Sequence, residues 1–421
     1  MTTYYCRVDG TASSVAAATG PITVPASCMS RNVFNAGSFS PGDEIIFSSR
    51  GGDFTYSIVV PSSGSSDSSR IILSADEGYA PNFSAGFDQN GKSYLTLNGL
   101  TAGTLSSPVP GTGFQFKGNA VGVIANNLIS FASSQGVAVG ASLSDTLSVV
   151  FNNLYSELVN GGTEGEAWTS HGAITCTING GTLTASGGDG CIESAGAPTV
   201  TFNDVYCTAT NGADAWKQSA TGVWTMNRCV FEEDPDKSSY GPDFSSSTYC
   251  YLYNCVFKNL TDAAYYLLFY NGALEHHVIN CTFIGDGVNT TIPILNQSPN
   301  GRYINNVFKN CGGTKCFYGT SGEIDYNAFY GSGTPRGTNY VTTDPLIDSD
   351  GKITSASSPL IDAGIGPDAD SDIPAWDIDN QERSGSTTDL GADLWVLSSI
   401  NLILSDGKIN SKIFDSNVIR G

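Results

Sequence analysis

The sequence has few basic residues and few charges of either sign. Lysine and arginine number 19 of 421 residues against 40 aspartates and glutamates, so the formal net charge is −21. A nucleic-acid backbone repels such a surface, and we therefore expect no nucleic-acid partner. Charged residues make up 14% of the chain, below the roughly 25% of an average soluble domain. This composition excludes a disordered acidic tail and a charge-rich helical bundle.

Long apolar runs and targeting signals are also missing. The longest apolar stretch, residues 263–270, is too short to cross a bilayer, so we expect no membrane insertion. The first residues, MTTYYCRVDG, have neither the basic nor the apolar segment of a secretory signal. This favours a protein that stays in the cytoplasm where it is made. The alternative is a secreted or cell-surface protein.

Histidine is scarce, and cysteine occurs in an odd number. The three histidines and 11 cysteines form no CxxC pair and no Cys/His cluster with the spacing of a zinc site. An odd count leaves at least one thiol unpaired, which argues against a complete disulfide framework. No motif requires a cofactor.

What the sequence does contain is a repeat. Short strand-like phrases recur with spacings of 21 to 28 residues, in the range typical of stacked supersecondary units. The phrases are NNLI (126–129), NNLY (152–155), NGGTL (179–183), NDVY (203–206), RCVF (228–231), NCVF (254–257), NCTF (280–283), NNVF (305–308) and YNAF (326–329).

Each repeat contains two or three short β-type runs separated by Gly, Asn, Asp and Ser, with almost no helical periodicity. A leucine-rich repeat would need several leucines at fixed offsets, and a propeller blade about 40 residues. The remaining choice is an all-β fold, a single-stranded parallel β-helix with one coil per repeat. Its handedness follows only from the resemblance given below.

Like residues should stack on like residues in such a fold. The phrases end in a column expected to lie in the core, namely Ile129, Tyr155, Leu183, Tyr206, Phe231, Phe257, Phe283, Phe308 and Phe329. Two positions earlier stand Asn127, Asn153, Gly181, Asp204, Cys229, Cys255, Cys281, Asn306 and Asn327. We interpret Cys229, Cys255 and Cys281 as an interior thiol ladder, because small sulfur side chains pack as minor hydrophobes. Metal ligation or redox chemistry is the alternative.

The chain divides into four predicted segments. Residues 1–40 form an N-terminal strand and cap, in which residues 26–39 have weak helical spacing and can cover the first coil. Residues 41–340 form the coils, and residues 341–395 close the β-helix. Residues 396–421 form a C-terminal β extension that serves as a cap, a docking element or an oligomerisation element.

Two segments besides the repeats carry a family resemblance. FSPGDEIIFSSRGG (39–52) is similar to the opening coil of right-handed parallel β-helix proteins, the pectin-lyase-like families of polysaccharide lyases, glycosidases and phage tailspikes. TDPLIDSDGKITSASSPLIDAG (343–364), followed by TTDLGADLW (387–395), resembles their closing module, although its last phrase departs from the usual DIGAYE. The resemblance implies the right-handed fold and leaves the function open.

One acidic column is a candidate for carbohydrate binding or catalysis. Aligning GGDGCIES (187–194) with NGADAWKQS (211–219) and YGPDFSSS (240–247) places Asp189, Asp214 and Asp243 together, with Trp216 beside them. Equal positions on neighbouring coils lie about 4.8 Å apart, and a glycosidase needs two carboxylates at roughly 5 to 9.5 Å. An ordinary turn is the alternative, since Asp is common at coil corners.

A second acidic loop is a candidate metal site. Asp368, Asp370 and Asp372 alternate along the chain, and calcium prefers several carboxylate oxygens in a flexible loop. The loop lacks the glycine and the closing glutamate of an EF-hand. The alternative is a solvated acidic loop without a metal.

These observations favour a structural protein of a bacteriophage virion, such as a tailspike, head fibre or capsid decoration. The resemblance to phage virion proteins implies a homotrimer that contacts other virion proteins. We expect it to bind host surface polysaccharide without being an enzyme. The first alternative is an extracellular polysaccharide lyase or glycoside hydrolase, and the second is a bacterial surface adhesin.

Overall fold

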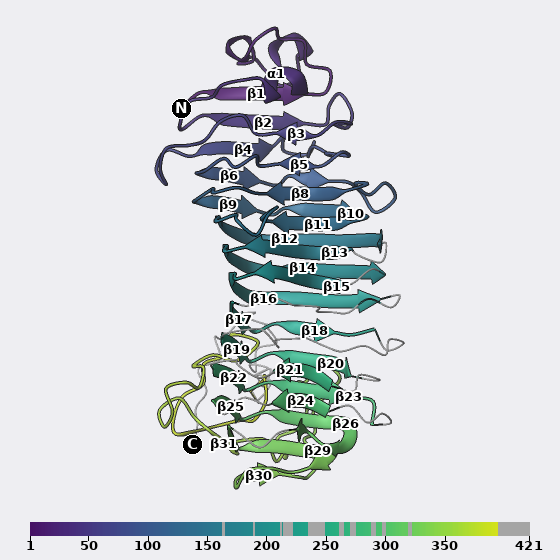
Figure 1. Ribbon diagram of the computed structural model, residues 1–421, viewed down its shortest axis with the longest axis vertical. Coiled ribbons are helices and arrows are strands. Elements are labelled where there is room, and N and C mark those ends of the chain that lie inside the picture. The colour runs from purple at the N-terminus through teal and green to yellow at the C-terminus, as the bar shows by residue number, and fades with distance from the viewer. Residues whose placement is uncertain are drawn as a thin grey trace, which may run out of the picture.

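Strands of successive coils lie side by side and build a right-handed parallel β-helix, which confirms the predicted fold class (Figure 1). The computed structural model describes residues 1–161, 165–187, 190–210, 213, 222–234, 249–260, 265–269, 275–287, 292–296, 300–318 and 322–394. Every pairing between coils in these residues is parallel, and the one antiparallel pair of named strands joins β31 (Gly364–Ile365) to β32 (Thr387–Thr388). Among the described residues, no helix has the length and apolar character needed to cross a membrane.

Two faces of the solenoid meet at a sharp corner. The strands before the corner are β2 (Glu44–Ser48), β4 (Ile71–Ala75), β6 (Leu95–Asn98), β9 (Val123–Asn126), β17 (Val223–Asn227), β19 (Tyr249–Tyr253), β22 (Glu275–Ile279), β25 (Gly301–Ile304) and β28 (Glu323–Asp325). Those after it are β7 (Thr101–Ala102), β10 (Ile129–Ala132), β18 (Val230–Glu232), β20 (Val256–Leu260), β23 (Thr282–Gly285), β26 (Val307–Lys315), β29 (Asn327–Thr334) and β30 (Tyr340–Val341). The long strands β12 (Ser148–Gly161), β14 (Thr175–Gly187) and β16 (Thr199–Thr210) run through the corner.

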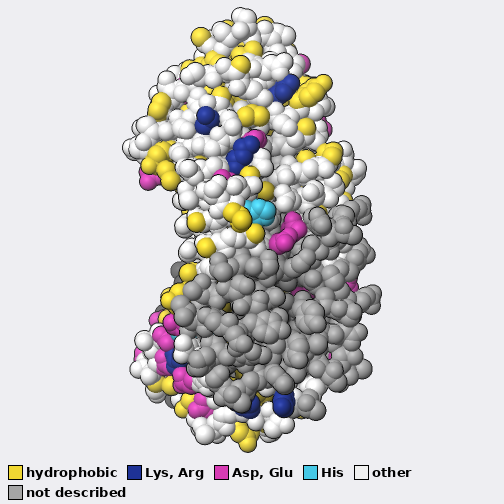
Figure 2. Space-filling model, in the orientation of Figure 1, with side chains coloured by type: hydrophobic (Ala, Val, Ile, Leu, Met, Phe, Trp, Pro, Cys, Tyr) yellow, Lys and Arg dark blue, Asp and Glu magenta, His cyan; other side chains and the backbone are white. Residues whose placement is uncertain are grey.

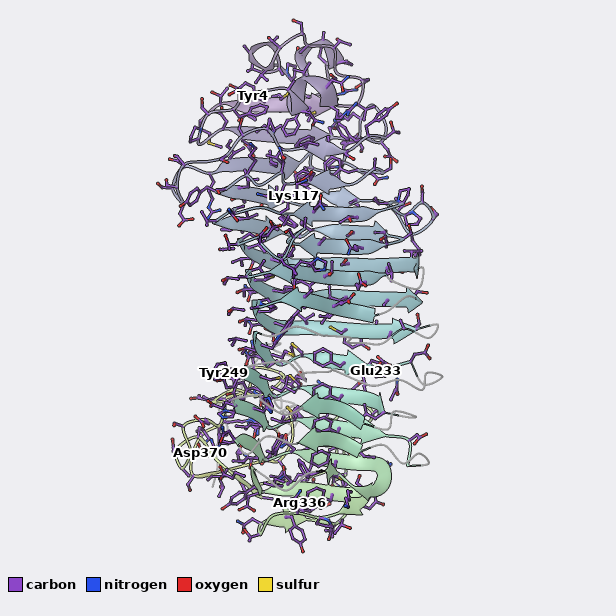
Figure 3. All side chains as sticks on the ribbon, viewed as in Figure 1. Tyr4, Lys117, Glu233, Tyr249, Arg336 and Asp370 are labelled. Atoms are coloured by element: carbon purple, nitrogen blue, oxygen red, sulfur yellow. The ribbon has the colours of Figure 1, made fainter. Side chains whose placement is uncertain are left out.

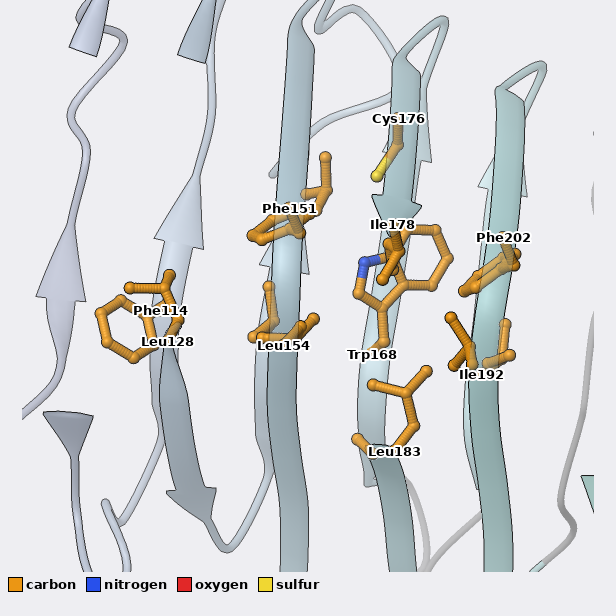
Figure 4. Packing of buried hydrophobic residues seen from close by; sticks show 14 of the residues in the cluster. Phe114, Leu128, Phe151, Leu154, Trp168, Cys176, Ile178, Leu183, Ile192 and Phe202 are labelled. Atoms are coloured by element: carbon orange, nitrogen blue, oxygen red, sulfur yellow. The ribbon is translucent and has the colours of Figure 1, made fainter. Parts of the chain in front are cut away.

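A third face completes each coil. Its first sheet contains β3 (Ile58–Val59), β5 (Phe87–Asp88), β8 (Thr112–Phe116), β11 (Gln135–Val139), β13 (Glu166–Gly172) and β15 (Gly190–Gly196), and its second contains β21 (Tyr265–Phe269), β24 (Ile292–Asn296) and β27 (Phe317–Tyr318). The core lies between the faces. Figure 4 shows Trp168 of the third face among Ile178, Leu183 and other core side chains. Its ring centroid is 5.5 Å from that of Phe202.

The N-terminal cap is less helical than its sequence suggests. Strand β1 (Thr3–Arg7) pairs with β2, and the short helices η1 (Val15–Ala17), η2 (Pro25–Ser27) and α1 (Arg31–Asn35) follow it. Phe34 of α1 is fully buried, with its ring centroid 5.0 Å from that of Phe47 in β2. The cap therefore covers the apolar end of the first coil.

The corner has a left-handed backbone in the coils from β6 to β28. One residue per coil has a φ between 51° and 70° there, and the column is Gly99, Asn127, Asn153, Gly180, Asp204, Arg228, Asn254, Asn280, Asn305 and Tyr326. Glycine adopts this conformation freely, and Asn and Asp tolerate it better than other side chains. This explains why most of the recurring phrases contain Asn at the same place.

The residue before the corner forms an amide ladder in the N-terminal half. Side-chain hydrogen bonds of 2.8 to 3.0 Å join consecutive coils. The ladder consists of Asn98, Asn126, Asn152, Asn179, Asn203 and Asn227. Each amide between the two ends of the ladder donates to one neighbour and accepts from the other, so the ladder satisfies polar groups and holds the coils in register.

The register corrects the predicted core column. Tyr155 pairs with Thr182, which in turn pairs with Tyr206 on the next coil. Tyr206 pairs with Val230 rather than Phe231. Ile129 is 39% exposed, and alternation along each strand directs Tyr155 and Tyr206 outward as well. The phrase-final residues Ile129, Tyr155 and Tyr206 therefore face outward. Leu183 and the phrase-final residues from Phe231 onward face the core.

In the C-terminal half the predicted aromatic stack is confirmed. The rings of Phe231, Phe257, Phe283, Phe308 and Phe329 are nearly parallel, with successive centroids 4.8 to 5.4 Å apart. All five are almost fully buried. Ring stacking adds to the burial of apolar area, so this column is a main contributor to the core.

The interior thiol ladder is also confirmed. Cys229, Cys255 and Cys281 are fully buried, and each thiol lies 3.5 or 3.6 Å from a backbone carbonyl of the preceding coil. Burial raises the pKa of the Cys229 and Cys255 thiols well above the ordinary value. They are therefore protonated packing residues without the thiolate that metal ligation or redox chemistry needs.

Residues 341–394, here called the closing module, fold back along the coils (Figure 1). Asn305 exchanges two hydrogen bonds with Ile365, and the Ala392 amide donates to the Thr282 hydroxyl at 3.0 Å. The Asn254 side chain donates to the Trp376 carbonyl at 2.7 Å. The module therefore covers the corner of the last coils, where outward positions such as Val256 and Thr282 become buried.

Candidate carbohydrate-binding groove

Upstream of the closing module the face after the corner is open. Ile129, Tyr155, Thr182, Tyr206 and Val230 follow one another on neighbouring coils, and we call them the outer column. Their strands alternate buried and partly exposed residues, so the whole column faces outward. Aromatic rings, hydroxyls and apolar groups are thus presented in a line parallel to the axis of the β-helix.

Two carboxylates hold the tyrosines of the outer column. The Tyr155 hydroxyl donates a hydrogen bond to Glu157, and the Tyr206 hydroxyl donates to Glu232. Burial and the neighbouring carboxylate raise the pKa of both phenols to about 12. Both phenols therefore remain protonated donors at neutral pH. Each ring is attached to its strand at one end and held by the hydrogen bond of its hydroxyl at the other.

The outer column ends in a groove beside the closing module. The groove has a volume of about 380 Å³. It is lined by Asp204, Val205, Tyr206, Arg228, Val230, Lys258, Asp350, Lys352, Ile378 and Asp379. The first six lie on the coils and the others on the closing module, so the two parts of the fold build it jointly. We call it the corner groove.

Lys258 is at the centre of the charged network in the corner groove. Its ammonium group lies 2.8 Å from Asp350 and 3.6 Å from Glu232, and 5.6 Å from the ring centroid of Tyr206. Burial alone would lower the pKa of Lys258, but the hydrogen bond to Asp350 and the attraction of Glu232 outweigh it and raise the pKa. Lys258 in turn lowers the pKa of Asp350.

The other cations of the corner groove are paired as well. Arg228 donates two hydrogen bonds, of 2.7 and 2.8 Å, to the carboxylate of Asp204. Lys352 lies 2.7 Å from Asp379. The described walls therefore present alternating donors and acceptors without a large excess of either charge.

This chemistry suits binding better than cleavage. A glycosidase needs one protonated carboxyl group near a second carboxylate, but Lys258 keeps Asp350 ionised. A lyase needs a base, but Lys258 remains protonated and Tyr206 has a raised pKa. Lys258, Asp350 and Tyr206 are therefore not suited to transfer a proton near pH 7.

The predicted acidic column cannot be compared with this groove. Asp189, Asp214, Trp216 and Asp243 all lie outside the described residues. Their proposed role in carbohydrate binding or catalysis stays a prediction.

The predicted calcium ligands contact an arginine. Asp370 and Asp372 both accept hydrogen bonds from Arg302, which also lies 2.8 Å from Glu323. The hydrogen bond from Arg302 is the main reason why the pKa of Asp370 is lowered. Asp368 contributes its backbone amide to the Gly385 carbonyl. In the described part of the chain, no group of three or more His, Cys, Asp or Glu side chains is arranged to hold a metal, and calcium binding stays a prediction.

A second polar cluster lies on the face before the corner. His277 is 3.2 Å from the Tyr253 hydroxyl and 3.0 Å from Glu275, and its ring is perpendicular to that of Tyr251. Burial is the main reason why the pKa of His277 is lowered. Figure 3 shows Tyr249, next to this cluster, on the same side of the molecule as Asp370 of the closing module. The neutral imidazole connects the strands beneath that module.

Acidic side chains concentrate over the closing module, at the lower left of Figure 2. Residues 341–394 contain 12 acidic and two basic residues. This excess surrounds the Arg302 cluster, whereas the outer column beyond the groove contains no charged side chain. The open face and the covered face therefore differ in electrostatic character.

No family model and no curated protein sequence matches the chain. Among solved structures, the complex of XylC with xylose is similar at a TM-score of 0.58 and 10% identity, over 94% of this chain and 98% of that one. Pectate lyase Pel9A has a TM-score of 0.48 and 15% identity, over 93% and 96% of the two chains. The chain has the right-handed, pectin-lyase-like parallel β-helix fold that carbohydrate-active enzymes share. Likeness at this identity concerns the fold alone.

Sequence reasoning missed the outer column because it placed Tyr155 and Tyr206 in the core. A usable signal was present: each follows an Asn-Asn or Asn-Asp pair by two residues, whereas the buried phenylalanines follow their corner residue by three. The residues of the closing module that line the corner groove had no such signal, because only folding brings them to β18 and β20.

Proposed function

We propose that the protein binds a glycan along the outer column and in the corner groove. The observation that carries the proposal is the line of fixed tyrosines leading into a groove of paired charges. Aromatic rings offer apolar faces to sugar rings, and a few polar groups in a groove orient a ligand. Sugar hydroxyls both donate and accept hydrogen bonds, so they match walls in which ammonium, guanidinium and carboxylate groups alternate.

The proposed ligand is neutral, and the proposed role is recognition without cleavage. A uronate would bring a further negative charge to walls whose cations already have carboxylate partners. The pKa directions of Lys258, Asp350 and Tyr206 make these three groups unsuitable as catalytic acid or base. The fold shared with carbohydrate-active enzymes is compatible with this role and does not by itself specify it.

Affinity gel electrophoresis tests the proposal. The protein is run through gels that contain xylan, glucomannan, mixed-linkage β-glucan or galactomannan, and through a gel without polysaccharide. We expect retardation in at least one of these gels and its loss in Tyr206→Ala. Tyr56→Ala is the matched control, because Tyr56 is 66% exposed and lies far from the groove in the N-terminal cap region.

Two results would overturn the proposal. One is migration that none of the four polysaccharides changes, and the other is equal retardation of Tyr206→Ala and the unmodified protein. Release of reducing ends from the retarding polysaccharide would leave binding in place and refute the role without cleavage.

A place on a phage virion, the homotrimer and contacts with other virion proteins stay predictions of the sequence. So does the adhesin alternative. Light scattering after size exclusion measures the native mass, and a trimer near three times 44.0 kDa is the expected result. A monomer would contradict the trimer.

A further inference from the structure

We infer that the outer column binds a linear, extended glycan parallel to the axis of the β-helix, at two aromatic subsites two coils apart. This inference rests on the proposed function and deepens it. The subsites are centred on Tyr155 and Tyr206, and they select a chain long enough to reach both.

The spacing of the subsites follows from the strand register. Tyr155 pairs directly with Thr182, and Thr182 pairs directly with Tyr206. Neighbouring parallel strands lie about 4.8 Å apart, so the two tyrosine positions are separated by about 9.6 Å. This is close to the length of two sugar units in an extended β-1,4-linked chain. One sugar can therefore lie on each ring, with one unit between them.

The residue between the tyrosines leaves room for that middle unit. Thr182 and its neighbour Thr184 on the same face are small and carry hydroxyls, and both are partly exposed. A third aromatic ring at Thr182 would make one continuous platform without a repeat. The alternation of ring, hydroxyl and ring instead matches a chain whose sugars alternate in orientation.

Both rings are held before a ligand arrives. Tyr155 contacts Glu157 through its hydroxyl and Phe131 through its ring, with centroids 5.5 Å apart. Tyr206 contacts Glu232 through its hydroxyl and Lys258 over its ring. Fixed side chains lose little conformational entropy on binding, so a ligand that matches their spacing gains from both contacts.

The closing module determines the direction of the bound chain. Beyond Val230 the equivalent positions Val256 and Thr282 are buried beneath the module. Beyond Tyr155, on the other side, Ile129 is 39% exposed and the face stays open. One end of the glycan therefore lies in the corner groove, and the chain continues over Tyr206 and Tyr155 toward the N-terminal end.

Calorimetric titration with oligosaccharides of increasing length tests this inference. The probes are xylo-, cello- and manno-oligosaccharides of two to six units. The unmodified protein should gain about tenfold in affinity between two and four units, because the second ring is then reached. Tyr155→Ala should lose this gain and keep its affinity for the disaccharide. Tyr206→Ala should lose affinity for every length.

Three variants control for folding and for ring chemistry. Tyr155→Phe keeps the ring and should keep the gain with length, which a general loss of structure in Tyr155→Ala would not predict. Thr182→Trp places a bulky ring between the subsites and should abolish the gain, whereas Thr182→Ser should keep it.

The possible failures are distinguishable. If disaccharides bind through Tyr206 but affinity does not rise with length, or if Tyr155→Ala keeps the rise, the two-subsite inference is wrong and the proposed function stands. If no probe binds and no polysaccharide retards the protein, both are wrong.

Discussion

The two halves of the solenoid use nearly the same phrase in different ways. Up to Tyr206 the phrase-final residues other than the buried Leu183 face outward, and an amide ladder lines the corner. From Phe231 onward they face the core, and the closing module covers the corner. The backbone of the corner is the same in both halves, with a left-handed residue in each coil from β6 to β28.

The difference shows what decides whether a side chain points to solvent or to the core. The deciding quantity is its distance along the chain from the corner residue, and not its place in the phrase. In NDVY, Asp204 is at the corner and Tyr206 follows two positions later. In NCVF, Asn254 is at the corner and Phe257 follows three positions later. Because side chains alternate along a strand, a shift of one position relative to the corner residue moves an aromatic side chain from the surface to the core.

The largest expected effect is on folding stability, and it should differ between phrase-final residues of the two halves. Phe283→Ala should destabilise the protein by about 3–5 kcal/mol, because it removes a buried ring from a continuous stack. Ile129→Ala should cost about 0.5 kcal/mol or less, because Ile129 is 39% exposed. Urea unfolding measures both, and equal losses would contradict the register described above.

The next effect concerns pH and the closing module. Burial is the main reason why the pKa of Asp393 is raised to about 7, whereas an unfolded aspartate has a value of about 3.9. Between these values the folded protein binds more protons than the unfolded chain. Stability should therefore fall as the pH rises from about 4 to 7, by at most about 4 kcal/mol.

Asp393→Asn tests this pH dependence. The amide oxygen can still accept the hydrogen bond from the Ile353 backbone, which is 3.0 Å long in the unmodified protein. Unfolding free energies from pH 4 to 8 should fall less steeply in the variant. Asp377, Asp379 and Lys352 also act on Asp393, and an unchanged slope would assign the pH dependence to other groups.

A smaller effect concerns the corner that both halves share. Asn127 is exposed and has a φ of 52°. Asn127→Val should destabilise the protein by about 1–2 kcal/mol, because a β-branched side chain is strained in this conformation. Asn127→Gly should be nearly neutral by the same unfolding measurement. A valine variant as stable as the glycine variant would refute the backbone argument.

The smallest expected effect is the loss of stability when one ion pair is removed in each half. Lys117 and Asp88 join neighbouring coils at 2.6 Å, and Lys258 and Asp350 join a coil to the closing module at 2.8 Å. Lys117→Met and Lys258→Met should each cost about 1 kcal/mol or less, and salt should reduce both losses. Only Lys258→Met should weaken glycan retardation; equal retardation in both variants would remove Lys258 from the site.

The repeat, the absence of helical periodicity and the corner asparagines were enough to predict the coil architecture. These are local signals, because each coil places the same residue types at the same bend. The thiol ladder and the Phe231–Phe329 stack were predicted correctly for the same reason. The surface position of Tyr155 was not, because the chain contains similar phrases offset by one residue.

The sequence by itself determined that this protein is a β-helix, because the backbone conformation at each corner depends on the residue at that corner. The tertiary structure alone decided which aromatic residues reach the surface and where the open face ends. Which aromatic residues reach the surface depends on strand register over many coils. Where the open face ends depends on the closing module, which brings Asp350, Lys352 and Asp379 back against the coils from far along the chain. No local pattern encodes a contact between segments so distant in sequence.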